Sequence, residues 1–341
     1  MPSRAQPAVN RQVLLKSRPE AIPQAEHFEI LETPVPEPGP GEVLVRNHYL
    51  SVDPAQRGWV SAVVNYSRTV GLGEVMRAFA VGEVIASRSP DFAVGDHVMG
   101  LFGWQEYAAV EPCSITRKVR ETDLPLSASL GVLGLTGVTA YFALRELGEP
   151  KAGDTVVVST AAGAVGSAAG QIAKVMGCHT VGITGGPAKA ALCRQRFGYD
   201  AAIDYKVGDL DAAIAKAAPR GVDVYFDNTA GPISDTVMRH LAVHARIVIC
   251  GTVSQPTWDP WPTGPRVERH LLVKRARMQG FVLFDYQHRY EEAVAALAGW
   301  LRAGKLHYEE EVLEGIEQAP GAIARLYRGE NKGKLLIRLG A

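Results

Sequence analysis

The spacing of apolar and polar residues changes near the middle of the chain. Over residues 13–122, short runs of alternating apolar and polar residues are interrupted by Gly and Pro. This pattern predicts antiparallel strands in a β-rich, barrel-like unit. Beyond residue 125, strand-like runs alternate with helix-like segments, which predicts a doubly wound parallel sheet and places the chain in the α/β class.

The elements of the second half can be placed one by one. Strands are predicted in the runs VVVST, TVGIT, AAIDY, VDVYFDN, ARIVICG and RARMQGFVLF. Helices are predicted over 165–177, 187–197, 208–218, 232–241 and 290–303. Two further strand-like runs, HYEEEVLE and GKLLIRL, follow the last helix and resemble the short strand-like runs of the first half. We therefore expect the C-terminus to return to the first domain.

Composition narrows the possible classes of protein. A chain of 341 residues, 47% of them hydrophobic, is long enough for two domains. Its 36 basic and 36 acidic residues cancel, so we expect no nucleic-acid partner and no membrane partner. The N-terminus is too polar for a signal peptide and the apolar run 130–144 is too short for a bilayer, which favours a cytoplasmic protein. The scattered cysteines predict reduced thiols: Cys113, Cys178, Cys193 and Cys250.

The segment 156–174, VVVSTAAGAVGSAAGQIAK, carries the most specific signal. A buried strand runs into a turn at Gly163 and Gly166 and then into a helix of small residues. Gly163 would let the backbone approach a pyrophosphate, and Gly166 would let the helix pack tightly on the sheet. Glycine-rich turns also close ordinary strand–helix units, but the strand before and the helix after this turn favour a dinucleotide site.

The end of the next strand favours NADP(H) over NAD(H). An NAD site usually has a carboxylate at this strand tip, whereas the run 178–184 ends in Gly185-Gly186-Pro187. A glycine tip followed by Lys189, with Tyr205 after the third strand, can hold a 2′-phosphate. Arg194 and Arg196 are better explained as solvated charges on a helix face.

Several motifs, in order, resemble a known family over essentially the whole chain. They are SVDPAQRGW, GEVM, AAGAVGSAAGQIAK, DYK, FDN, CGTVS and GFVLFDY. Together they resemble the zinc-independent enone reductases of the medium-chain dehydrogenase/reductase superfamily. The resemblance implies a GroES-like domain over 1–138 plus 305–341 and a Rossmann domain over 139–304. It also implies a homodimer and NADPH-dependent reduction of a conjugated C=C bond.

The resemblance assigns roles to individual residues. It implies that Gly163, Ala164, Val165 and Gly166 hold the pyrophosphate, that Lys189 and Tyr205 hold the 2′-phosphate, and that Asn228 contacts the ribose or adenine. The positions implied for the nicotinamide half are Cys250, Gly251, Thr252, Ser254, Phe281, Val282, Leu283 and Asn331. Phe281 and Phe284 can also be core aromatics, and Asn331 can be a turn residue.

Tyr66 matches an aromatic position at the active-site lip, where its phenol would hydrogen-bond the substrate carbonyl or protonate the enolate. The alternative is a loop tyrosine with a packed ring. Several relatives have tyrosine at Val273 and a larger residue at Ala55, so the pocket is expected to be wide. Trp258 and Trp261 indicate a bulky apolar enone, or else a dimer contact.

Zinc-dependent relatives place a cysteine at Asp53 and a histidine within 71–74, so the resemblance implies no metal site. Oxidising a plain alcohol without a Lewis acid is hard, whereas an enone needs only a hydride at its β-carbon, stabilisation of the enolate and a proton. A quinone reductase and a non-catalytic NADPH-binding protein remain alternatives.

Overall fold

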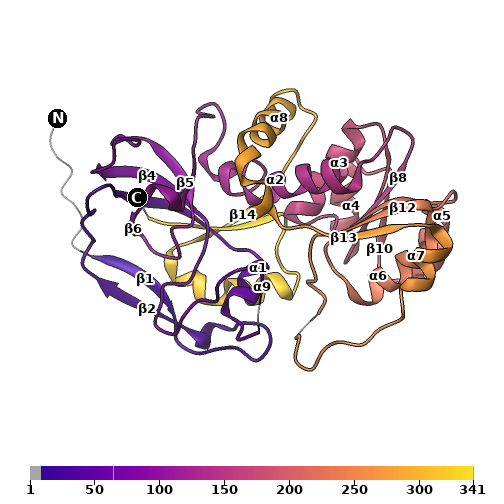
Figure 1. The fold of residues 1–341 in the computed structure, drawn as a ribbon, viewed down its shortest axis with the longest axis horizontal. Helices are drawn as coiled ribbons and strands as arrows, with labels where there is room; N and C mark the ends of the chain where they lie inside the picture. Colours follow the sequence, from indigo (N-terminus) through magenta and orange to yellow (C-terminus); the bar gives the residue numbers. More distant parts are fainter. Residues whose placement is uncertain (1–8, 64, 256, 341) are drawn as a thin grey trace. The chain divides into compact units, whose positions relative to one another are not determined.

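The computed structural model describes residues 9–63, 65–255 and 257–340. The chain divides into two compact units. The first contains the residues up to Leu130, Glu310–Asn331 and the residues from Leu335 onward. The second contains Gly131–Glu309 and Lys332–Lys334. In Figure 1 the first unit combines the indigo and purple N-terminal segments with the yellow C-terminal end.

The first unit is built on antiparallel strands. A two-stranded sheet pairs β1 (Asn10–Leu15) with β2 (Phe28–Thr33). A seven-stranded sheet has the order β14-β15-β3-β4-β5-β7, with β6 paired to β3. Its strands are β3 (Val43–Ser51), β4 (Ala80–Ser87), β5 (His97–Gly100), β6 (Tyr107–Val110), β7 (Ile115–Lys118), β14 (Glu310–Glu314) and β15 (Lys334–Arg338). Helices α1 (Ala55–Val60) and α9 (Ala319–Tyr327) complete the unit.

Two features hold the first unit together. The C-terminal strand β15 pairs antiparallel with β3, with Leu336 opposite Ser51. Trp104 is fully buried, packs its ring 5.7 Å from that of Phe28 and donates its indole N–H to the Ser51 carbonyl at 3.1 Å. This tryptophan therefore fastens the two-stranded sheet to the larger one and satisfies its own polar group.

The second unit contains a six-stranded parallel sheet with the order β10-β9-β8-β11-β12-β13. Its strands are β8 (Thr155–Ser159), β9 (His179–Thr184), β10 (Ala201–Asp204), β11 (Val222–Asp227), β12 (Leu241–Ile249) and β13 (Arg277–Gly280). The strand order reverses between β8 and β11, which makes this a Rossmann sheet. In such sheets ligands bind at the carboxyl ends of the strands, beside the point of reversal.

Helices cover both faces of this sheet. They are α2 (Leu135–Phe142), α3 (Ala164–Val175), α4 (Pro187–Gln195), α5 (Leu210–Ala217), α6 (Gly231–Val237), α7 (Glu268–Lys274) and α8 (Tyr290–Arg302). Ile214 of α5, Val237 of α6 and Leu271 of α7 pack into one apolar core. Helix α3 packs on β8 and β9 and against α2, and Figure 1 shows it on the other side of the sheet. The predicted α/β class, with a sheet domain and a Rossmann domain, is confirmed.

Some element boundaries differ from the prediction. The helix expected over 232–241 ends at Val237, a 3-10 turn covers Met238–His240, and β12 already begins at Leu241. His244 has a positive φ of 64° within that strand, so the β11–β12 ladder shifts register and the strand is longer than its apolar run suggests. The run RARMQGFVLF forms only the short strand β13, because Leu283–Arg289 turns into a 3-10 helix, η6.

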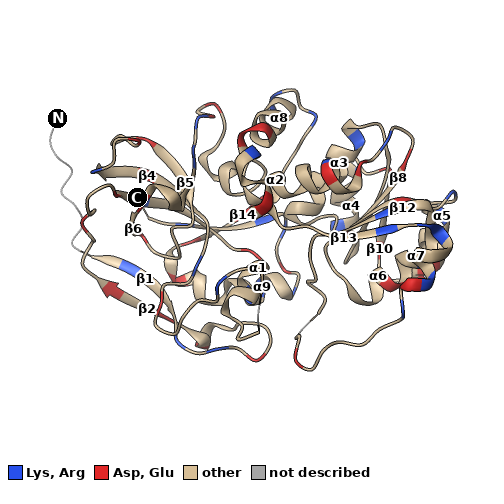
Figure 2. Ribbon diagram, in the orientation of Figure 1, with Lys and Arg blue, Asp and Glu red and all other residues tan. Residues whose placement is uncertain are grey.

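No helix in the described part of the chain is both long and apolar enough to cross a membrane. Figure 2 shows basic and acidic residues interspersed along the chain.

Candidate functional site

The glycine turn after β8 is shaped by backbone contacts. Thr160 has a positive φ of 53°, and its carbonyl accepts the Gly163 N–H at 2.8 Å. A Cβ on Gly166 would lie 2.9 Å from the Ala161 Cα and closer still to the Thr160 carbonyl. Only glycine therefore lets α3 start this close to the turn. Gly163 is the N-cap, and Ala164, Val165 and Gly166 form the first turn of α3.

The start of α3 fits an anionic group. The N-cap residue is glycine and provides no side-chain acceptor. The first N–H groups of a helix have no intrahelical acceptor, and the helix dipole adds partial positive charge there. The residues predicted to hold a pyrophosphate are thus brought together at the carboxyl end of β8, next to the reversal in strand order.

A buried carboxylate at the end of β11 organises the next loop. Asp227 is 1% exposed and accepts the N–H groups of Thr229 at 2.8 Å and Ala230 at 3.0 Å. Its carboxylate also accepts the hydroxyl of Tyr225 at 3.0 Å. These bonds satisfy the buried charge and fix the loop that follows β11.

Asn228 connects the carboxyl ends of β11 and β8. Its side-chain amide donates to the Ser159 carbonyl at 2.7 Å, and its backbone N–H donates to the Ser159 hydroxyl at 2.8 Å. One N–H of the side-chain amide is therefore bonded within the protein, so a ribose or adenine contact would use its second N–H or its carbonyl oxygen.

Residues 250–254, predicted to line the nicotinamide half, are hydrogen-bonded to the same loop after β11. The N–H groups of Cys250 and Gly251 both donate to the Asp227 carbonyl, and the Ser254 hydroxyl donates to the Thr229 carbonyl at 2.7 Å. Thr252 lies between them and is half-buried. Burial raises the pKa of the Cys250 thiol to about 12, so this group stays protonated and is no nucleophile at neutral pH.

The carboxyl end of β9 leads into a second glycine turn, Gly185-Gly186, before α4. Gly186 has a positive φ of 94°, and its N–H donates to the Asp204 carboxylate at 2.8 Å. A Cβ on Gly185 would lie 3.0 Å from the Lys206 Cε and 3.2 Å from the Tyr205 hydroxyl. Tyr205 and Lys206 thus lie over the glycine turn, while Lys189 is the third residue of α4, which starts directly after it.

Residues 281–283, which follow β13, are largely buried. Phe281 is 7% exposed and stacks on Tyr286 with ring centroids 5.3 Å apart, and Tyr286 stacks in turn on Phe142. The Phe281 N–H donates to the Ile249 carbonyl, which extends the sheet by one bond. The ring is thus a core aromatic. Leu283 is buried and Val282 half-buried.

Two of the predicted site residues belong to the first unit. Tyr66 is 55% exposed, so its ring is not packed in the core, and it lies close enough to Tyr327 for the two phenols to interact electrostatically. Tyr327 donates its hydroxyl to the Pro54 carbonyl at 3.1 Å, and burial raises its pKa to about 12. Asn331 is half-buried in the irregular segment before β15.

The positions that would hold zinc in metal-dependent relatives have other partners here. Asp53 accepts the Ser51 hydroxyl, and Glu74 is paired with Arg68 and accepts the Gly71 N–H at 2.8 Å. Within residues 9–63, 65–255 and 257–340, no group of three His, Cys, Asp or Glu side chains could hold a metal ion. All four cysteines are free.

The structure places Val273 away from the strand ends. It lies near the end of α7, which returns the chain to the start of β13, so it sits at the edge of the sheet opposite Ser159 and Asp227. The expectation that Val273 widens a pocket there is therefore wrong. Trp258 and Trp261 pack together with ring centroids 5.3 Å apart, and Trp261 is 74% exposed.

Sequence reasoning missed the residues that support these loops. Asp204 and Asp227 accept backbone N–H groups at two strand ends, and the Ser159 hydroxyl donates within the second group, to Asp227 at 3.3 Å. A carboxylate as the last residue of a strand, directly before a loop, is the signal that could have found the first two.

Comparisons with known proteins match both parts of the chain. A family model described as the N-terminal domain of oxidoreductase matches residues 11–117, and a zinc-binding dehydrogenase model matches 164–299. The NADPH-dependent curcumin reductase of Escherichia coli (strain K12) is 40% identical over 335 residues, covering 97% of each chain. The NADP(+)-dependent 2-alkenal reductase of Nicotiana tabacum is 38% identical over 339 residues, covering 98% of each.

A solved structure gives the same result. The crystal structure of CurA from Vibrio vulnificus in complex with NADPH superposes with a TM-score of 0.91 at 42% identity, covering 97% of this chain and 99% of that one. The fold and these matches define an oxidoreductase of the medium-chain dehydrogenase/reductase class. Within that class, the chain belongs to the family of the curcumin and alkenal reductases, which confirms the resemblance of its motifs.

Proposed function

We propose that this protein reduces the C=C bond of α,β-unsaturated ketones and aldehydes with NADPH. The observation that carries the proposal is the pair of glycine turns on neighbouring strands, in a chain 40% identical to an NADPH-dependent curcumin reductase. One turn opens α3 at the end of β8, and the other opens α4 at the end of β9.

The second turn supports NADPH rather than NADH. Two lysines, Lys189 and Lys206, accompany the turn, against the single carboxylate of Asp204. That carboxylate already accepts the N–H groups of Gly186 and Lys206. The excess of positive charge and the Tyr205 hydroxyl suit the 2′-phosphate, which NADH lacks.

Each group of residues then has one task. The first turn of α3 binds the pyrophosphate, and the loops fixed by Asp227 orient the nicotinamide half. Bound NADPH would supply a hydride, which the electron-poor β-carbon of an enone accepts. The Tyr66 phenol donates a hydrogen bond to the carbonyl oxygen as negative charge grows there, and a proton delivered to the α-carbon completes the saturated product.

The packed pair of a half-buried Trp258 and an exposed Trp261 supports a bulky apolar substrate. Trp258 and Trp261 lie on the loop that follows the carboxyl end of β12, the edge of the sheet where ligands bind. Aromatic rings at such an edge offer apolar contact area to a large enone.

We also propose a cytoplasmic homodimer. Strand β13 is the last strand of the parallel sheet and its four residues are exposed, so its outer ladder groups suit pairing with a second copy. Four free thiols fit a reducing compartment. The Phe281 N–H faces β12, so the N–H groups of Met278 and Gly280 face outward. Sedimentation of the wild type and of Met278→Pro, which removes an outward donor from the edge strand, tests the dimer: the variant should be monomeric.

Stopped-flow oxidation of NADPH with a panel of enones and quinones tests the function. With NADPH deuterated at the nicotinamide C4, the label should appear at the β-carbon of a saturated ketone, and no allylic alcohol should form. Label at the carbonyl carbon would overturn the proposal, and turnover with quinones alone would replace it with quinone reduction.

A further inference from the structure

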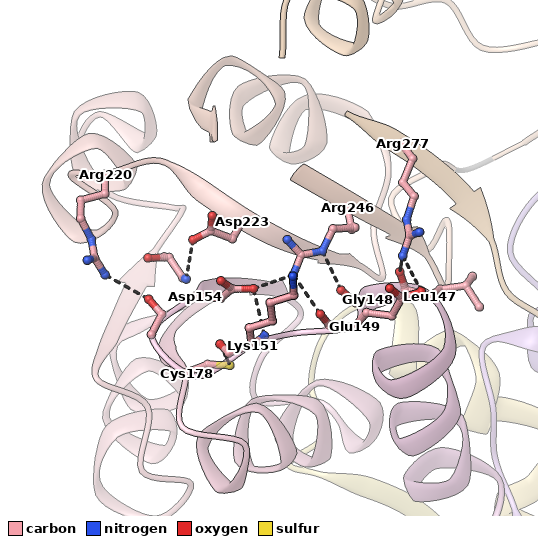
Figure 3. A network of polar contacts seen from close by, with 12 residues as sticks. Leu147, Gly148, Glu149, Lys151, Asp154, Cys178, Arg220, Asp223, Arg246 and Arg277 are labelled. Atoms are coloured by element: carbon pink, nitrogen blue, oxygen red, sulfur yellow. Dashed lines mark hydrogen bonds and ion pairs between the residues drawn. The ribbon is translucent and has the colours of Figure 1, made fainter. Parts of the chain in front are cut away.

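A basic hollow lies at the end of the parallel sheet where its strands begin. Its volume is about 300 Å³, and its charged or titratable lining residues are Glu149, Lys151, His244, Arg246, Arg275 and Arg277. Figure 3 shows most of these side chains together with their partners. The hollow therefore gathers four permanent cations and one histidine around a single lining carboxylate.

The hollow is separate from the candidate dinucleotide site. Arg246 of β12 lies opposite Arg277 of β13 in the ladder, whereas Ile249 and Gly280 form the pair at the carboxyl end. The Arg246–Arg277 pair and the Ile249–Gly280 pair are three residues apart along their strands, which corresponds to about 10 Å. The two glycine turns begin beyond the carboxyl ends, so they lie at the far edge of the sheet.

Two of the arginines form a fixed floor. Arg246 donates to the carbonyls of Gly148 at 2.9 Å and Glu149 at 3.1 Å and is paired with Asp154. Arg277 donates to the Leu147 carbonyl at 2.9 Å and is paired with Glu149 at 2.8 Å. Both therefore cap the end of the π-helical turn Ala143–Gly148, where carbonyls and the helix dipole favour cations (Figure 3).

The other basic side chains of the lining have no such structural task. In the part of the chain that the structure describes, the Lys151 ammonium, the Arg275 guanidinium and the His244 ring have no carboxylate partner. Counting Asp154 behind the floor, four permanent positive charges face two negative ones. Like charges around a concave surface repel one another and raise the local concentration of anions.

We propose that this hollow binds a compact phosphate-bearing polyanion. Arginine forks and a lysine ammonium are the groups that recognise phosphate oxygens, and a fixed floor reduces the ordering that binding requires. The volume accommodates two phosphate groups rather than an extended chain. The ligand chemistry differs from that of an enone, and the site does not depend on the proposed reaction.

Calorimetric titration of the full-length protein with inorganic pyrophosphate at low ionic strength tests the proposal. With saturating NADP+ occupying the α3 turn, we expect one saturable pyrophosphate site per chain, because the hollow and the dinucleotide turns lie at opposite ends of the sheet. Inorganic phosphate, with less charge, should bind more weakly. Loss of all pyrophosphate binding in the presence of NADP+ would assign the site to the α3 turn and overturn the proposal.

A charge-matched pair of variants separates a built site from general attraction. Lys151→Gln/Arg275→Gln removes both charges but keeps polar side chains, and with saturating NADP+ it should weaken pyrophosphate binding at least tenfold. Lys216→Gln/Lys305→Gln removes the same charge from exposed positions of the same unit and should leave the affinity within twofold. Equal weakening by both pairs, or none by the first, would contradict the proposal. Sedimentation and NADPH binding should match the wild type in both variants.

Discussion

The hydroxyl of Tyr199 donates a 2.6 Å hydrogen bond to the carbonyl oxygen of Gly166, in the first turn of α3. Tyr199 is 4% exposed, and a Cβ on Gly170 would overlap its ring. The glycine in α3 thus makes room for a tyrosine that follows α4 in sequence. This buried hydrogen bond ties the first turn of α3 to the segment that follows α4.

Tyr199→Phe should weaken the binding of NADPH and NADH by the same factor, about three- to tenfold. The hydroxyl contributes to the position of the α3 turn, and both dinucleotides carry the pyrophosphate that this turn would bind. Fluorescence titration measures both dissociation constants, and kcat at saturating NADPH should stay within twofold.

Tyr141→Phe is the matched control for this hydrogen bond. Tyr141 is equally buried in the same unit, but its hydroxyl interacts with Glu292 and Arg145, away from the glycine turns. Its cofactor affinity should match the wild type. If both variants bind NADPH equally well, the Tyr199 hydroxyl serves packing alone.

The glycine turn after β9, with Lys189 and Lys206 beside it, leads to a prediction about cofactor choice. NADPH should bind at least tenfold more tightly than NADH, which corresponds to about 1.4 kcal/mol. Lys189→Ala and Lys206→Ala should each reduce this ratio by weakening NADPH alone, because only the 2′-phosphate differs. Arg194→Ala, in the same helix as Lys189, is the control. Equal affinities for NADPH and NADH in the wild type would overturn the assignment of this turn to the 2′-phosphate.

Local patterns predicted the parts of the fold whose causes are local. The apolar run of β8, the glycines of the first turn and the glycine tip of β9 can all be recognised within a few residues. The supporting bonds cannot, because they join distant segments: Tyr199 reaches Gly166, and Asn228 reaches Ser159. The position of Val273 was missed for the same reason, since it depends on how α7 returns along the sheet.

Buried thiols should make the fold sensitive to alkaline pH. Burial raises the pKa of Cys178 to about 11 and those of Cys193 and Cys250 to about 12. The folded state therefore retains protons that the unfolded chain releases near pH 9. The stabilisation is complete below pH 9 and is lost as the pH rises toward 11–12.

Urea denaturation between pH 8 and 11 measures this effect. Cys193→Ala lowers stability at every pH because it leaves a cavity, but it should also flatten the fall of the unfolding free energy with pH by about 1.4 kcal/mol per pH unit. Cys113→Ala removes an exposed thiol and should leave the slope unchanged. Identical slopes in the wild type and Cys193→Ala would show that this thiol does not contribute.

Tyr66 carries the most direct prediction about catalysis. Tyr66→Phe removes one hydroxyl from a side chain that is more than half exposed, so the fold should be unaffected. If the phenol stabilises the developing enolate, kcat should fall about 10- to 100-fold, or about 1.4 to 2.7 kcal/mol of transition-state stabilisation. The affinity for NADPH should stay the same, because the proposed phosphate contacts all belong to the second unit.

Tyr327→Phe separates this role from a general effect of removing a phenol nearby. The Tyr327 hydroxyl already donates to the Pro54 carbonyl, and its raised pKa makes it a poor proton donor at neutral pH. Its kcat should therefore stay within about twofold of the wild type. A large loss in Tyr327→Phe with none in Tyr66→Phe would move the catalytic phenol to Tyr327. If neither variant loses activity, the hydrogen bond to the enolate comes from another donor, such as a cofactor hydroxyl or water.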